Sequence, residues 1–354
     1  MAWNTTSDAV IWIFNVGRGS AAFVRTPFNK GILIDISRSE PFSTSKFILD
    51  NLYDKLSTQD EKRIAQAILT HPHTDHISDC EALASGSKLY PKLLTCPNDK
   101  IPAEAVNWSR IKNIDKDKSL AKYRALFEGR SAGLQTIEHD SPYIKPSEFE
   151  YGIYYLRPPI CEKLHTVDND YGNAISLVTY FRYGSQSILF PGDITPEAMA
   201  AILGEREGAE KRFTIFNQQF QSKNPRWSKE TFNQPSLKSR LSTYGLSVLV
   251  APHHGLESCH STELHEAMKD GKPDLIVISE KYGPGVTEGK THGNYQCKDG
   301  AKGLRIQMGN QLTAEPRYSI STKSNHILIR FSGTGAPRVI CENRIEDLMK
   351  WANQ

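Results

Sequence analysis

The pattern of hydrophobic and polar positions predicts short strands at the start of the chain. Residues 9–16 and 21–25 are apolar runs rich in β-formers, separated by the turn sequence Gly17-Arg18-Gly19. Residues 31–36 form a third run, apolar up to Asp35. A helix is predicted for 45–56, because its apolar residues recur at helical spacing, and a short buried strand for 64–70.

The remainder of the chain mixes strands with helices. Further strands are predicted at 92–96, 151–156, 174–181, 187–190, 247–251, 275–279 and 326–331, and helices at 77–84, about 103–131, about 263–269 and 345–352. Strands come first, and helices are interspersed between the later ones. This order favours an α/β fold with two sheets packed between helices over a regular parallel alternation.

The chain shows no long linker, repeat or low-complexity tract, so we expect one domain over 1–354 with two insertions, about 97–142 and 204–244. The second insertion is unusual. From 211 to 240 it carries seven Lys or Arg residues against one Glu, interleaved with five aromatic residues. Basic and aromatic side chains together suit a groove for single-stranded nucleic acid. An ordinary amphipathic insertion with solvated charges is the alternative.

Composition limits the class of protein. A hydrophobic content of 38% and a charged content of 23% are typical of a soluble globular protein, and a net charge of +3 is too small to imply a polyanionic partner. The six cysteines form no C-x-x-C pair, which indicates reduced thiols. No basic leader and no apolar stretch of about 20 residues stands out, so we expect a cytoplasmic protein with no membrane association.

One cluster carries the chemistry. His71, His73, Asp75 and His76 place three imidazoles and a carboxylate within six positions, directly after a predicted strand. In an extended loop His71 and His73 point to one side and can share a metal ion, and the turn into a helix directs Asp75 and His76 to a second ion. Two divalent ions held in this way can lower the pKa of a water molecule between them towards neutrality.

Two later strand ends offer further ligands. Asp193 follows a strand in Pro191-Gly192-Asp193, where a tight turn presents one carboxylate that could bridge two cations. The pair His253 and His254 ends another apolar strand. We expect one of the pair to ligate a metal and the other to face the substrate or orient its neighbour, and spacing does not decide which. We assign His253 to the metal and His254 to catalysis, together with Asp75.

The order H-x-H-x-D-H, Gly-Asp and a late His resembles the metallo-β-lactamase superfamily, over about 9–279. Five segments are similar to the hydrolase domain of bacterial competence proteins for DNA uptake: 14–20, 33–35, 172–178, 192–194 and 252–255. The competence motifs differ here, with Asn15, Arg18 and Ser20 in the first and Leu256 after the last. The resemblance implies a four-layer αββα sandwich with helical or irregular insertions.

The resemblance also implies two metal ions, with Zn²⁺ expected and Mn²⁺ as the alternative. Asn173 stands where much of the superfamily has a His ligand, as in the competence-like branch, and an amide oxygen is a weaker zinc ligand than imidazole. His165 is the alternative for that position. His292 lies in a Gly-rich stretch and could donate a proton to a leaving group or bind a phosphate; a surface role is an equal alternative. Cys259 is expected to remain an unligated thiol.

The superfamily's mechanism is attack by a hydroxide held between two metal ions on a carbonyl carbon or a phosphorus. We therefore expect a hydrolase, with a phosphodiesterase or nuclease favoured and nucleic acid or a nucleotide as substrate. One alternative is a lactonase, thioesterase or β-lactamase-like enzyme acting on a small acyl substrate. The other is a non-catalytic metal-binding subunit of a DNA-processing or defence assembly. The sequence does not decide the natural substrate, endo- or exo-action, the oligomeric state or the pathway.

Overall fold

The computed structural model describes residues 8–17, 19–56, 64–97, 106–114, 116–128, 149–165, 168–204, 235–279 and 293–352. The strands are β1 Ala9–Ile13, β2 Ala22–Arg25, β3 Gly31–Ile34, β4 Ile64–Ile68, β5 Leu93–Thr95, β6 Glu150–Tyr154, β7 Val178–Tyr183, β8 Gln186–Phe190, β9 Val248–Val250, β10 Leu275–Ile278, β11 Gln307–Met308, β12 Gln311–Leu312, β13 Ser319–Ser321, β14 His326–Phe331 and β15 Arg338–Glu342. The helices are α1 Thr44–Phe47, α2 Thr74–Ile77, α3 Lys118–Glu128, α4 Pro158–Leu164, α5 Asp168–Ala174, α6 Pro196–Gly204, α8 Leu237–Tyr244, α9 Thr262–Ala267 and α10 Ile345–Ala352.

The strands form two sheets. The first has nine strands in the order β12-β11-β15-β14-β1-β2-β3-β4-β5, and the second has six in the order β13-β10-β9-β8-β7-β6. In the first sheet β1 to β3 pair antiparallel, whereas β4 and β5 join in parallel. In the second sheet β8, β9 and β10 are parallel neighbours. The loops after β8 and β9 lie at one edge of the second sheet because these strands are parallel neighbours, and the loop after β4 of the first sheet contacts them there.

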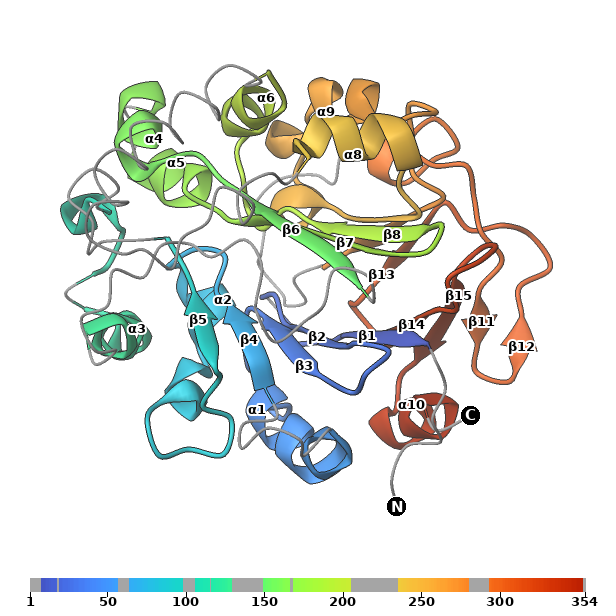
Figure 1. Ribbon diagram of the computed structural model, residues 1–354, viewed down its shortest axis with the longest axis horizontal. Helices are drawn as coiled ribbons and strands as arrows, with labels where there is room; N and C mark the ends of the chain where they lie inside the picture. The colour runs from blue at the N-terminus through green and yellow to red at the C-terminus, as the bar shows by residue number, and fades with distance from the viewer. Residues whose placement is uncertain are drawn as a thin grey trace.

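Alternating side chains build two cores. Along β1, Ala9, Ile11 and Ile13 belong to the core between the sheets, while Val10 and Trp12 belong to the core shared with the helices. Helices α6, α8 and α9 lie over the second sheet, and α1 and α10 lie beyond the first (Figure 1). The architecture is therefore a mixed α/β sandwich compatible with the metallo-β-lactamase type, as the sequence predicted.

Several predicted elements differ from the observed ones in type or in bounds. The helix predicted for 45–56 is α1 followed by a π-helix at Ile48–Leu52 and a 3-10 helix at Tyr53–Lys55. The strand predicted from 174 begins only at Val178, because α5 extends to Ala174. A short apolar run fits the end of a helix as well as the start of a strand, so the sequence pattern alone does not locate this boundary. Strands β11, β12, β13 and β15 were not predicted at all; the first three have only two or three residues each.

The predicted insertions are partly described. The first contributes a 3-10 helix at Trp108–Arg110 and α3, and its residues 98–105, 115 and 129–142 lie outside the described part of the chain. The second contributes α8, while 205–234, and with it most of the basic and aromatic stretch, lies outside as well. All six cysteines are free thiols. Within the described ranges, no helix has the length and apolar character needed to cross a bilayer.

Candidate metal centre

The loop after β4 carries the first group of candidate ligands. Its start is fixed by two hydrogen bonds that backbone amides donate, from Leu69 N to Thr95 O (2.8 Å) and from Thr70 N to the side-chain carboxylate of Asp35 (2.7 Å). His73 is extended, with φ −92° and ψ 143°, and α2 begins at the next residue. The imidazoles of His71 and His73 consequently lie 4.7 Å apart, centroid to centroid, and His71 is fully buried.

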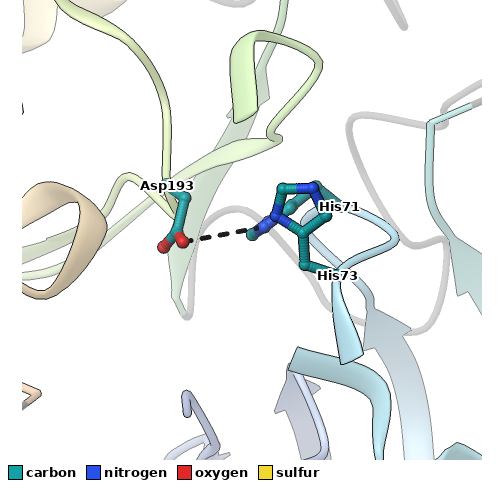
Figure 2. A group of neighbouring side chains, drawn as sticks. All are labelled: His71, His73 and Asp193. Carbon is teal, nitrogen blue, oxygen red and sulfur yellow. Dashed lines mark ion pairs between the residues drawn. The ribbon is translucent and has the colours of Figure 1, made fainter. Parts of the chain in front are cut away.

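Asp193 meets this loop from the second sheet. It follows Gly192, whose φ of +61° favours glycine and where an added Cβ would come within 3.1 Å of Thr70. Oδ2 of Asp193 lies 3.7 Å from His71 Nε2, and Oδ1 lies 3.1 Å from His76 Nε2. Figure 2 shows the Asp193 side chain facing the two imidazoles across the gap between the loops. The single carboxylate of Asp193 therefore lies close to both His71 and His76.

The loop after β9 supplies the third part. His253 and His254 both adopt positive φ, 46° and 58°, a conformation that non-glycine residues adopt rarely and that often marks functional sites. His254 Nε2 lies 3.6 Å from Asp75 Oδ2 and 3.7 Å from Asp193 Oδ2. His253 Nε2 also lies 3.7 Å from Asp193 Oδ2, with a side chain 25% exposed.

These contacts define two groups of three candidate ligands. One comprises His71, His73 and Asp193, and the other comprises Asp75, His76 and His254; within each group the ligand-type atoms lie within 4.8 Å of one another. Five of the seven predicted metal-site residues are thus brought together, namely His71, His73, Asp75, His76 and Asp193, and His253 stands beside Asp193. His254, which we had expected to be catalytic, is the member of the pair that falls in a ligand group.

The donor atoms fit divalent cations. Among the described residues, His71 Nε2, His254 Nε2 and Asn173 Oδ1 are buried without a hydrogen-bond partner, which is costly unless something else satisfies them. Ligands at roughly 2.0–2.2 Å from a tetrahedral ion lie about 3.4 Å from one another. The 3.1–3.7 Å distances from Asp193 to the imidazoles are close to that spacing.

The charge balance at the centre follows from these distances. Burial opposes ionisation of Asp193, but the imidazoles of His76, His254 and His71 outweigh it and hold the pKa of that carboxyl well below its usual range. Burial likewise opposes protonation of His76, and there the carboxylates of Asp193 and Asp35 win and raise its pKa well above the usual value. Burial dominates at His71 and lowers its pKa. Without bound cations, the centre is a buried array of ion pairs.

Hydrogen bonds made by Nδ1 fix the orientation of the His76 and His254 rings. His76 Nδ1 donates to Asp35 Oδ2 (2.7 Å), and His254 Nδ1 donates to the carbonyl of Ser279 (2.8 Å). In the neutral rings this leaves Nε2 with its lone pair towards the cluster, the arrangement typical of metal-binding histidines. Asp35 itself has φ 54° at the end of β3, and its carboxylate also accepts from the Thr70 hydroxyl (2.9 Å).

The segment around Asn173 packs against the first group. A Cβ on Gly172 would lie 2.5 Å from His73 Nε2, so the end of α5 leaves space for that imidazole only because residue 172 is glycine. Asn173 is buried, and its orphaned Oδ1 is chemically suited to a divalent ion. His165, the alternative ligand, instead makes a 3.0 Å hydrogen bond between its Nε2 and Thr195 Oγ1.

A small cavity of about 20 Å³ adjoins the ligands, room for roughly one water molecule. Its walls include Thr70, Asp193 and His254 on the polar side and Ile34, Phe190 and Val250 on the apolar side. His292 lies outside the described residues. Cys259 is a buried free thiol whose Sγ is 3.1 Å from His253 Nδ1.

Three contributing residues escaped the sequence analysis. Asp35, Thr70 and Ser279 bond ligands, or the residues that bond them, and none belongs to a recognisable motif by itself. Asp35 did carry a signal: it is a lone carboxylate at the end of a buried strand, the same context as Asp193. Ser279 contributes its backbone carbonyl, which no sequence pattern identifies.

No protein-family model matches the chain, and none of the curated proteins matches it. Among solved structures it is similar to CmlA, a diiron beta-hydroxylase from Streptomyces venezuelae, with 12% identity, and to a variant of the CmlA beta-hydroxylase, with 11%. The TM-score is 0.36 in both comparisons, which cover 77% of this chain. The chain spans less than half of each of those proteins, 44% and 45%. A likeness at this level adds nothing to what the strand order and the layers establish.

Proposed function

We propose that the chain is a metal-dependent hydrolase of the metallo-β-lactamase superfamily, acting with two divalent cations on a phosphodiester. The observation that carries the proposal is the pair of three-residue ligand groups that meet at the Asp193 carboxylate. Their buried nitrogens without hydrogen-bond partners support it, because such atoms are costly to keep without a ligand.

The proposal assigns three residues to each cation and gives Asp193 a part in both sites. His71, His73 and Asp193 would hold the first, with the Asn173 amide as a fourth donor. Asp75, His76 and His254 would hold the second, and the two oxygens of Asp193 would serve both sites. When bound, the cations would supply an acidified water molecule and an electrophile for the scissile group.

Other groups of the protein would orient the ligand rings and contact the substrate. Asp35 and the Ser279 carbonyl hold the rings of His76 and His254 with Nε2 towards the cations. His253 is the more exposed of the pair, so its Nε2 is the better placed to contact a substrate or to transfer a proton. We therefore propose His254 as the ligand and His253 as the substrate-facing residue, the reverse of the assignment made from the sequence.

The preference for phosphodiesters rests on chemistry and on the sequence resemblance. Asp75, Asp193 and Asn173 make the donor set rich in oxygen, which suits Mn²⁺ as well as Zn²⁺. The segments similar to competence proteins point to a nucleic acid or nucleotide substrate. A lactone, thioester or β-lactam substrate would use the same ligands, and so would a non-catalytic subunit. Only an assay separates these alternatives.

The test combines metal content with turnover. We expect purified protein loaded with Zn²⁺ or Mn²⁺ to bind close to two ions per chain by mass spectrometry, with iron measured in the same samples. It should cleave bis(p-nitrophenyl) phosphate and plasmid DNA. Asp75→Asn should reduce both metal content and the rate, the latter at least about 100-fold, because it weakens a ligand. Asp270→Asn, which breaks an exposed ion pair with Lys302, is the matched control and should change neither.

Two results would redirect the proposal. Turnover of lactones or nitrocefin without phosphodiester cleavage would assign the small acyl substrates instead. Two bound ions without turnover on any of these substrates would favour the non-catalytic role. Fewer than about one ion per chain after loading would contradict the metal centre itself.

A further inference from the structure

Asp117, the residue before α3, contacts the middle of the loop that carries His71 to His76, here called the histidine loop. Asp117 Oδ1 accepts from Ser119 N (2.7 Å) and so caps the helix, while Oδ2 accepts from the hydroxyl of Thr74. Thr74 stands between His73 and Asp75, one candidate ligand from each group. A single side chain from the predicted 97–142 insertion therefore contacts the hinge between the two halves of the proposed centre.

Helix α2 needs support from outside. It has four residues, and its N-cap, His73, provides no side-chain cap. A helix this short is not stable by itself, so its position depends on the contacts that its residues make. Two of these are backbone bonds, from Ser20 N to Asp75 O (3.0 Å) and from Ile36 N to His76 O (2.9 Å). Both come from loops of the first sheet, whereas the Thr74 bond is to Asp117, the residue that precedes α3.

Asp117 is held in place by a well-packed helix. Leu120 and Tyr123 of α3 are buried in the core at 1% exposure each, and Trp108 packs edge-on to the Tyr123 ring at 6.0 Å. An aspartate on such a support keeps its carboxylate in one place, so its bond to Thr74 restrains the loop. An aspartate on a mobile surface segment would not do so.

The same segment also contacts the other wall of the first site. Asn107 N donates to the hydroxyl of Tyr171 (2.8 Å), and Arg110 lies 4.8 Å over the Tyr171 ring and donates to His165 O (2.8 Å). Tyr171 immediately precedes Gly172, which packs on His73. Residues 106–114 and 116–128 thus touch both the histidine loop and the end of α5, the two walls that flank His73.

We propose that Asp117 is a positioning residue for the metal centre. Through Thr74 it fixes the turn between His73 and Asp75, and so sets the relative orientation of one ligand in each group. The inference rests on the metal centre of the proposed function, and it assigns to the insertion a role in building that centre. Asp117 touches neither ligand ring and need not contact the substrate.

The test measures metal affinity rather than activity alone. Thr74→Val removes the hydroxyl with little change of shape, Asp117→Asn removes the charge while keeping a capping side chain, and Thr74→Ser restores the hydroxyl. We expect the first two to weaken Zn²⁺ binding about tenfold in competition with a chelating dye, as changes to outer contacts of metal sites do. Both should also alter the absorption spectrum of the Co²⁺-loaded protein. The serine variant should match the wild type, and the double variant should be no weaker than either single one.

Glu81→Gln is the matched control, because the Glu81–Lys122 ion pair also joins α3 to the loop region but touches no candidate ligand. Unchanged Zn²⁺ affinity and an unchanged Co²⁺ spectrum in Thr74→Val would overturn the inference. An equal loss in Glu81→Gln would overturn it too, since docking of α3 in general would then be responsible. If Asp117→Asn does not fold, the valine and serine variants of Thr74 still decide. A wild-type protein that binds neither Zn²⁺ nor Co²⁺ would instead contradict the proposed function.

Discussion

At residue 172 the absence of a side chain makes room for an imidazole. Most glycines in the described chain are explained by positive φ, but Gly172 lies in α5 without such a backbone angle. Its distinguishing feature is the 2.5 Å approach of His73 Nε2 to the position that a Cβ would take. The atom that would have to move is the end of a side chain, so the helix could keep its place while the ring is displaced.

Gly172→Ala should therefore damage the site and spare the fold. We expect Zn²⁺ affinity to fall by about tenfold or more, because His73 can no longer point its Nε2 to the first site. The midpoint of thermal unfolding of the metal-free protein should change little. Gly204→Ala is the matched control: it is also a helical glycine, and a Cβ there meets no atom of the described residues within 4 Å. It should keep full metal affinity. Equal affinities in the two variants would show that His73 does not bind.

His326 offers a pH prediction away from the metal centre. It is buried beside the rings of Phe14 and Phe42, its Nδ1 accepts from Asn15 N, and burial lowers its pKa to about 4. The folded state thus binds fewer protons than the unfolded state, whose histidine pKa is about 6.5. The stability that the neutral ring contributes is complete above about pH 6.5 and is lost as the pH falls towards 4, by roughly 3 kcal/mol in total.

His326→Asn lacks the titrating ring and should remove that part of the pH dependence. In urea unfolding, the difference in free energy of unfolding between wild type and variant should shrink as the pH falls from 7 to 4. A difference that stays constant over this range would mean that His326 titrates normally in the folded chain. Comparing the two proteins cancels the contribution of the other histidines.

At the scale of elements, local rules predict which side chains lie together when the candidate ligands are concentrated in a short segment. His71, His73, Asp75 and His76 lie within six positions, and their alignment by a strand end and a helix start could be predicted from local rules. Asp193 and the His253–His254 pair could be added because each follows an apolar strand. Two sheets packed between helices could be predicted from the order of strands and helices, and the four-layer form from the family resemblance.

Other features depend on partners distant in the sequence. Asp35 matters because parallel pairing of β3 and β4 brings it beside Thr70 and His76. The choice between His253 and His254 depends on the positive φ of both residues, which no hydrophobic pattern reveals. The two-residue strands β11 and β12 are shorter than any periodic signal, and the link between Asp117 and Thr74 joins residues 43 positions apart.

At the scale of the whole molecule, the last strands complete the sheet that the first strand begins. Strand β14 pairs with β1 along five residues, and β15 extends the sheet to β11. Arg330 of β14 forms an ion pair with Asp8 (3.1 Å) and donates to the carbonyl of Trp351 in α10 (3.3 Å). The two ends of the described chain therefore pack against each other, although the motif resemblance stops near residue 279.

Removing residues 325–354 should abolish cooperative folding. The truncation exposes the β14-facing edge of β1 and the apolar side chains Ile327, Ile329 and Phe331 leave the core between the sheets. Removing only 343–354 is the control. It deletes α10 but keeps both sheets, so cooperative unfolding should persist with a free energy of unfolding lower by on the order of 3–6 kcal/mol, for the burial of Leu348 and Met349. A sigmoidal urea transition in the longer truncation would contradict this account.

The candidate ligands come from both layers of the sandwich: the histidine loop extends from the first sheet, and Asp193 and His254 extend from the second. A cation bound there would act as a cross-link between the sheets. The free energy needed to separate the two sheets would then depend on the concentration of free metal. At 100 times the dissociation constant, one ion should stabilise the folded chain by about 2.7 kcal/mol.

Amide hydrogen exchange can detect that cross-link. Added Zn²⁺ should slow exchange at Leu69 and Ala251, whose amides are bonded at the metal end of each sheet. Amides at the far ends of the same sheets, such as Arg25 and Arg182, should respond less. Protection confined to one sheet would show that the ion is held by a single loop and that the layers open independently. Protection in both would mean that the availability of metal sets how readily the two sheets separate.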